Sequence, residues 1–337
     1  MGLVRDINHD FGDGTWLGSE ARLIRIWGPQ TLTAGAEYRF NLRQHQRNYD
    51  GSPAFTNADD TRRSHVAAVY LQDEVALASW IKILGGVRHD YYDTFGGTTN
   101  PRLGAILQPA AGTTFKLLYG RAFRAPNVYE QFYEGGGSKP NPDLKPERIG
   151  TVEAVLEQSL GEKTRLVASA FDYRITDLIS QTTDPDDGLI YFRNADRVRA
   201  VGGELEVESR LSRRLEGRVS LIVQNAEDRG TGERLTNSPR YSAGLGLSAN
   251  LVRRKLWASL DGRYLGSRRS VQDTEVPGFV VVNLGLSGRR VLGGLDVSAG
   301  IYNLLDEQYG DPGGEEHLQA FITQNGRGFR LKLSYGV

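Results

Sequence analysis

The histidines and acidic clusters of this chain are the side chains best suited to catalysis or metal binding. The five histidines show no HExxH or other metal-ligand spacing, and there is no GxSxG nucleophile elbow. Residues 184–188 (DPDDG) carry the oxygen ligands that calcium prefers, but they lack EF-hand spacing, so a solvated turn is the favoured interpretation. The sequence therefore predicts no enzyme, no bound metal and no cofactor.

Residues 124–139 contain side chains that are better suited to binding a ligand than to catalysis. Aromatic surface comes from Tyr129, Phe132 and Tyr133. Positive charge comes from Arg124 and Lys139, and the combination suits an anionic chelate. The alternative is that these five residues only pack the loop or lie at an interface.

Composition narrows the possible classes of protein. Lysine plus arginine and aspartate plus glutamate number 41 each, so the formal charge is zero, which argues against a nucleic-acid partner. No run of about 18 apolar residues occurs, which excludes a transmembrane helix. The mean hydropathy of −0.42 does not exclude a membrane β-barrel, because barrel strands alternate lipid-facing and lumen-facing residues.

Alternating apolar and polar residues are the main signal of secondary structure. In Tyr241–Leu251, apolar side chains fall almost entirely on one parity and small polar ones on the other. Leu295–Ile301 and Phe329–Tyr335 repeat this pattern. A strand separates the two sets onto opposite faces, whereas a helix would mix them. A soluble sheet with one wet face would give the same alternation.

The length of the segments and of their connections favours a membrane barrel over a soluble sheet. We count about fifteen such segments of roughly 10–16 residues, longer than the strands of soluble proteins. Short connections, such as those at 28–29, 78–79 and 253–254, alternate with long polar ones at 44–63, 125–146, 181–188, 226–238 and 306–319. Barrels with tight periplasmic turns and large extracellular loops show this alternation. Three tryptophans lie beside short turns, where an interfacial aromatic belt is expected: Trp27, Trp80 and Trp257.

Motifs from residue 70 to the C-terminus resemble those of TonB-dependent outer-membrane receptors. Residues 121–149 (RAFRAPNVYEQFYEGGGSKPNPDLKPERI) are similar to the family's FRAP…NPxLKPE segment. Residues 70–92 resemble its QDEW…GLRYD hairpin, with Val75 in place of the usual tryptophan. Three further segments follow in family order. The family's N…A…GVELE strand is similar to residues 192–207, its NLFDKxY segment to residues 302–309, and its closing strand to residues 324–335.

The resemblance implies an all-β fold, a transmembrane antiparallel β-barrel, with this chain as roughly the last 15 strands of a barrel of about 22. Residues 1–337 would then be one partial barrel domain. Residues 1–13 show no signal peptide, and nothing resembles a plug domain or a TonB box. We therefore expect an incomplete receptor that by itself neither closes as a monomeric barrel nor drives energised uptake.

The function implied by the resemblance is uptake of a scarce nutrient across the cell outer membrane of a Gram-negative bacterium. The expected partners are outer-membrane lipid, a siderophore-like or cobalamin-like ligand, and TonB, ExbB and ExbD through the part not seen here. Two alternatives are a passive porin or structural barrel, which would share the strand pattern, and a soluble β-repeat binding protein.

Overall fold

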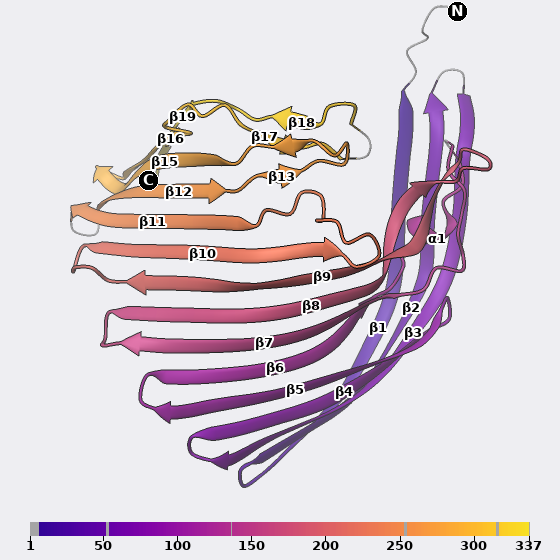
Figure 1. Cartoon of the computed structure of the whole chain (residues 1–337), viewed down its shortest axis with the longest axis horizontal. Helices are drawn as coiled ribbons and strands as arrows, with labels where there is room; N and C mark the ends of the chain where they lie inside the picture. The colour runs from indigo at the N-terminus through magenta and orange to yellow at the C-terminus, as the bar shows by residue number, and fades with distance from the viewer. Residues whose placement is uncertain (1–6, 52–53, 136, 253–254, 315–316, 337) are drawn as a thin grey trace, which may run out of the picture. The chain divides into compact units, whose positions relative to one another are not determined.

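The structure is a computed structural model that describes residues 7–51, 54–135, 137–252, 255–314 and 317–336. Within these ranges it contains a large antiparallel sheet, two small hairpins and the short helix α1 (Val128–Phe132) (Figure 1). None of its helices is long and apolar enough to cross a membrane. The predicted all-β fold class is confirmed.

The large sheet contains fifteen described strands that are hydrogen-bonded in chain order, with the two small hairpins left out of that order. This is the number of strands that the sequence predicts. Their bounds are β1 (Asn8–Trp27), β2 (Gln30–Gly51), β3 (Ala54–Ala78), β4 (Ile81–Tyr92), β5 (Gly96–Ala110), β6 (Thr113–Arg124), β7 (Glu147–Leu160), β8 (Thr164–Thr183), β9 (Ile190–Ser209), β10 (Leu215–Asp228), β11 (Tyr241–Val252), β12 (Leu256–Leu265), β15 (Phe279–Leu292), β16 (Leu295–Tyr302) and β19 (Gly328–Tyr335). The small hairpins left out are β13 (Arg268–Arg269) with β14 (Glu275–Val276), between β12 and β15, and β17 (Gly310–Pro312) with β18 (Phe321–Thr323), between β16 and β19.

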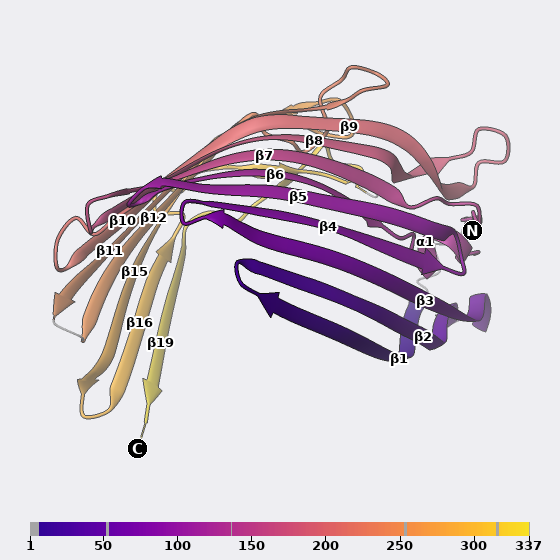
Figure 2. The same ribbon diagram turned by 90° about the horizontal axis from the view of Figure 1, so that it is seen from below.

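The chain divides into two compact units. The first comprises Met1–Ile106, Leu118–Val152 and Tyr173–Val198, and the second comprises Leu107–Leu117, Glu153–Asp172 and Arg199–Val337. In the first unit, β1 to β4 lie side by side as successive antiparallel hairpins (Figure 2).

Close packing across β2 and β3 depends on a glycine. The ring of Tyr70 lies over Gly35, its pairing partner, and a Cβ at that position would approach the ring to 2.3 Å. Any side chain at position 35 would therefore displace Tyr70. Glycine at position 35 thus leaves room for Tyr70 of β3 to lie across β2 and donate a hydrogen bond to Glu20 of β1.

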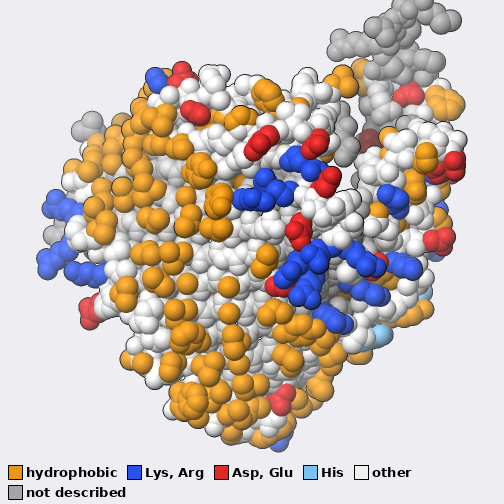
Figure 3. All heavy atoms as spheres, viewed as in Figure 1, with side chains coloured by type: hydrophobic (Ala, Val, Ile, Leu, Met, Phe, Trp, Pro, Cys, Tyr) orange, Lys and Arg blue, Asp and Glu red, His pale blue; other side chains and the backbone are white. Residues whose placement is uncertain are grey.

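The second unit confirms the predicted alternation. Strands β16 and β19 pair so that Val297 faces Leu333 and Ile301 faces Phe329, while Ser298 faces Lys332 on the other side. The apolar side chains of β19 are largely exposed, with Phe329 at 75%. Apolar side chains also gather over β10 to β12, at the left of Figure 3.

The exposed apolar face requires an apolar surrounding. Leaving one Leu, Val or Phe side chain in water instead of burying it costs about 1.5–3 kcal/mol, and such residues follow one another on strand after strand. Among the residues that the structure describes, few large apolar side chains are buried, and the buried ones include Leu144, Phe171, Val198, Val276 and Phe279. A sheet of this kind is stable when lipid covers its apolar face.

Most of the short turns predicted from the sequence are turns in the part of the chain that the structure describes. Trp27 ends β1, Trp80 lies in the turn between β3 and β4, and Trp257 lies in β12 one residue after that strand begins. The predicted turn at 253–254 lies outside the described residues.

Two predicted long loops are structured differently. Residues 44–63 are mostly strand, because β2 runs to Gly51 and β3 begins at Ala54. Residues 306–319 include β17, which pairs with β18. A hairpin that is solvated on both faces has polar side chains on both parities. Its sequence therefore lacks the apolar alternation that distinguishes a strand from a loop.

Candidate functional site

The candidate site is built on the β6–β7 loop, residues 125–146, in the first unit. Its helix α1 begins after Asn127, whose side chain accepts a hydrogen bond from the Glu130 backbone N–H at 2.8 Å. The Glu130 carboxylate in turn accepts from the Asn127 backbone N–H at 2.9 Å. This reciprocal capping box stabilises a helix of only five residues and fixes where it begins.

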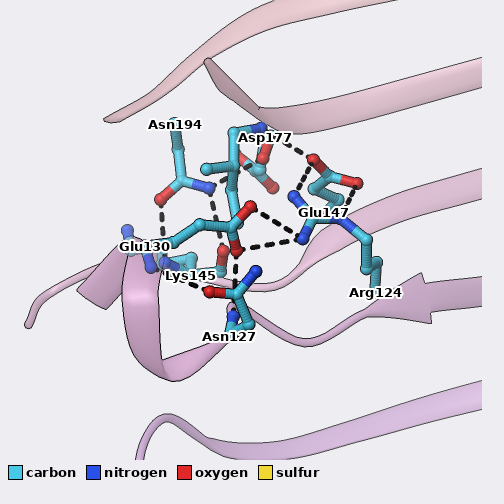
Figure 4. A network of polar contacts seen from close by, with 8 residues as sticks. Arg124, Asn127, Glu130, Lys145, Glu147, Asp177 and Asn194 are labelled. Atoms are coloured by element: carbon cyan, nitrogen blue, oxygen red, sulfur yellow. Dashed lines mark hydrogen bonds and ion pairs between the residues drawn. The ribbon is translucent and has the colours of Figure 1, made fainter. Parts of the chain in front are cut away.

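Arg124, the last residue of β6, connects the helix to β7. It donates two hydrogen bonds to Glu147, of 2.6 and 2.8 Å, and others to both oxygens of Glu130, each of 2.9 Å (Figure 4). Glu147 also accepts the Ile179 backbone N–H of β8 at 2.9 Å. Because one guanidinium faces two carboxylates, its positive charge is already compensated.

Asn194 of β9 holds the segment that leads into β7. Its side-chain N–H groups donate to the carbonyl oxygens of Lys145, at 2.8 Å, and Asp177, at 2.7 Å, and its side-chain oxygen accepts the Lys145 backbone N–H at 2.8 Å (Figure 4). Asp177 has a positive φ of 58° inside β8, an uncommon conformation for a residue with a side chain. Leu144, the neighbour of Lys145, is only 2% exposed. The LKPE motif, residues 144–147, is thus held by hydrogen bonds to the Lys145 backbone and by the buried Leu144 side chain.

Lys139 lies between two acidic residues of the β8–β9 connection. Its ammonium donates to Asp184 and, at 2.7 Å, to Asp187, and it lies 5.0 Å from the centre of the Tyr191 ring. The hydrogen bond to Asp184 and then that to Asp187 raise the pKa of Lys139, and Lys139 lowers the pKa of both carboxyls. The acidic turn at 184–188 therefore bonds a lysine of the same chain. Within the described ranges, no cluster of His, Cys, Asp or Glu could hold a metal ion.

The three aromatic candidates gather on and beside α1. The rings of Tyr129 and Tyr133 are 4.5 Å apart between centroids, and Phe192 of β9 meets Tyr129 edge-on at 5.9 Å. The guanidinium of Arg62 lies 3.7 Å from the centre of the Phe132 ring. Burial raises the pKa of both tyrosines, so they are neutral hydrogen-bonding groups at physiological pH. Tyr129 remains 45% exposed and is available for contact.

The structure places all five residues named from the sequence in or next to this loop. It also adds residues that the sequence reasoning missed, namely Asn127, Glu130, Glu147 and Asn194. The first two were recognisable, since an Asn followed three residues later by Glu is a helix-start signal. Glu147 and Asn194 had no such signal, because their partners lie on other strands.

The fold and the loop together define a class of protein: a sheet of long antiparallel strands with an apolar face suited to lipid, and a structured polar loop at the end of its strands. The family model described as TonB dependent receptor-like, β-barrel, matches residues 2–304. The chain belongs to this family.

Curated relatives agree with the family. The Vibrio cholerae iron-regulated outer membrane virulence protein is 24% identical over 277 residues, covering 73% of this chain and 42% of that protein. The Haemophilus influenzae heme/hemopexin utilization protein C is 25% identical over 353 residues, covering 89% of this chain and 47% of that protein. The chain thus spans less than half the length of these relatives.

Solved structures show the same fold. The copper transporter OprC superposes with a TM-score of 0.78 at 20% identity, covering 97% of this chain and 57% of the other. The ferric enterobactin receptor PfeA of Pseudomonas aeruginosa, in complex with enterobactin, gives a TM-score of 0.76 at 19% identity, covering 98% and 55%. At this identity the likeness concerns the fold alone.

Proposed function

We propose that the chain forms part of the barrel of an outer-membrane receptor that imports a scarce nutrient as a chelate. The observation that carries this proposal is membership of the receptor-barrel family, together with a loop that presents aromatic side chains on a fixed support. Names of relatives, which include heme utilization and ferric enterobactin receptors, favour a heme-like or siderophore-like ligand. A cobalamin-like ligand stays a prediction of the sequence.

The loop supports ligand contact chiefly through its aromatic residues. Arg124 and Lys139 are each paired with two carboxylates, so a purely anionic ligand would compete with groups already in place. A planar, aromatic chelate can instead stack on Tyr129, Phe132 and Tyr133. In this proposal the two cations position the loop and offer their remaining N–H groups to the ligand.

Transport would follow from the same proposal. The nutrient would cross the outer membrane with energy supplied through TonB, ExbB and ExbD, and the chain would act without catalysing a reaction. A passive porin would need no structured ligand loop of this kind, and a soluble binding protein would not expose an apolar face.

Ligand titration of the chain in detergent tests the proposal. We expect hemin or ferric enterobactin to quench protein fluorescence saturably, and Tyr129→Ala combined with Tyr133→Ala to weaken binding about tenfold, the loss of two aromatic contacts. Tyr49→Ala is the matched control, because Tyr49 lies in a different hairpin and stacks on His9. Equal affinities of the loop variant and the control variant would contradict the assignment of the site.

A further inference from the structure

A second polar region lies on the sheet of the first unit, on strands β1 to β4. There Arg88 of β4 donates two hydrogen bonds to Glu37 of β2, of 2.6 and 2.8 Å, and a third to Asp90, of 2.9 Å. The Tyr70 hydroxyl of β3 donates a hydrogen bond to Glu20 of β1 at 2.6 Å. The Arg88 guanidinium carbon lies 5.7 Å from the centre of the Tyr70 ring. These contacts join the four strands β1 to β4. The carboxylates of Glu37 and Asp90 are both bonded to Arg88.

A pocket of about 430 Å³ opens beside this group, and two further arginines line it. Arg102 of β5 and Arg121 of β6 are exposed, and neither side chain makes a hydrogen bond or ion pair with any residue that the structure describes. The Arg102 side chain extends toward β6, where its Cγ would lie 3.9 Å from a Cβ on Gly120. Glu37 and Asp90, the carboxylates of the pocket, are already bonded to Arg88.

A third lining residue also lacks a partner. Asn100 is 8% exposed, and its side-chain nitrogen has no hydrogen-bond acceptor among the described atoms. Buried amide groups in folded proteins nearly always have a partner, so an unpaired one marks a place for a missing acceptor. The lining holds Arg88, Arg102 and Arg121 against Glu37 and Asp90, that is three positive charges and two negative ones.

We infer that this wall pocket binds a small anionic solute through a carboxylate or phosphate group held by Arg102 and Arg121, with Asn100 as an additional donor. Guanidinium groups present N–H donors in a planar fork that matches both kinds of oxyanion. The pocket shares no residue with the loop site, so the inference goes beyond the proposed function and does not depend on it.

Calorimetric titration of the full chain, folded in an uncharged detergent, tests the inference with two probes, citrate for carboxylates and inorganic phosphate for phosphates. We expect saturable binding of at least one probe and a loss of tenfold or more in Arg102→Gln combined with Arg121→Gln. The matched control is Arg25→Gln combined with Arg63→Gln, which removes the same charge from exposed positions in the same unit.

The outcomes separate the possibilities. Stronger binding of citrate or of phosphate identifies the chemical class of the anion. Equal weakening in the pocket variant and its control would show general attraction by charge and would overturn the inference, as would no binding of either probe to the unaltered chain. If the double variant does not fold, Arg102→Gln alone gives the same comparison with Arg25→Gln. Loss of hemin binding in the tyrosine variants with citrate binding unchanged would show that the two sites are independent.

Discussion

At the scale of single residues, the ion pairs of Lys139 give a pH dependence with a definite sign. The lowered pKa values of Asp184 and Asp187 mean that their contribution is complete above the usual aspartate value of 3.8 and is lost as the pH falls through the lowered values. The raised pKa of Lys139 extends the pairing to high pH. The contacts between the β6–β7 loop and residues 184–187 should therefore be insensitive to pH near neutrality.

We expect the Lys139 backbone amide, which donates to Ile190 at 2.8 Å, to stay protected from hydrogen exchange between about pH 6 and pH 9. Protection should fall only below about pH 4, where aspartates protonate. Exchange rates corrected for intrinsic pH dependence measure this. Lys139→Met, which keeps the length of the side chain and removes its charge, should show weaker protection throughout and no acid transition. A transition near pH 6.5 in the unaltered chain would contradict the assignment.

At the scale of elements, α1 illustrates how a short helix depends on its first residue. A helix of five residues is too short to be stable alone, so its cap and the contacts of Arg124 must hold it. Replacing Asn127 by Ala should destabilise the helix by about 1 kcal/mol, because the Glu130 backbone N–H loses its acceptor.

Hydrogen exchange of the Gln131 and Tyr133 amides, which bond within the helix, measures this change. Asn127→Ser is the matched control, since serine retains a capping oxygen and should preserve most of the protection. Exchange in Asn127→Ala no faster than in Asn127→Ser would show that the cap is not what stabilises α1.

At the scale of the whole molecule, the two faces of the sheet should respond differently to charge. Leu245 of β11 lies opposite Val219 on the exposed apolar face, whereas Ser248 lines a polar pocket with Glu216 and Asp261. In a lipid bilayer, Leu245→Arg should lower the free energy of unfolding by about 2–4 kcal/mol near the midplane, because the charge would enter hydrocarbon.

Ser248→Arg supplies the control, because it adds the same side chain to the polar face of the same strand and should cost much less. Denaturant titration of the chain in phosphatidylcholine vesicles, followed by tryptophan fluorescence, gives both values. Similar losses in the two variants would show that the faces are assigned wrongly.

The sequence by itself determined the strands, their alternating faces and most of the turns. The reason is local: successive side chains of a strand point to opposite sides, so each alternating segment shows by itself that Val297, or Leu333, lies on an apolar face. The family motifs placed the loop with its aromatic residues for the same reason, since each lies within a short run of sequence.

Only the tertiary structure decided which charges are free. Arg124 and Glu147 are 23 residues apart, and Lys139 and Asp184 are 45 apart, so the sequence shows their charges without showing that they neutralise one another. It likewise gave no sign that Arg102 and Arg121 would share a pocket with no carboxylate left to bind them. Ion pairing depends on which strands become neighbours and in what register, and no local pattern of residues records that arrangement.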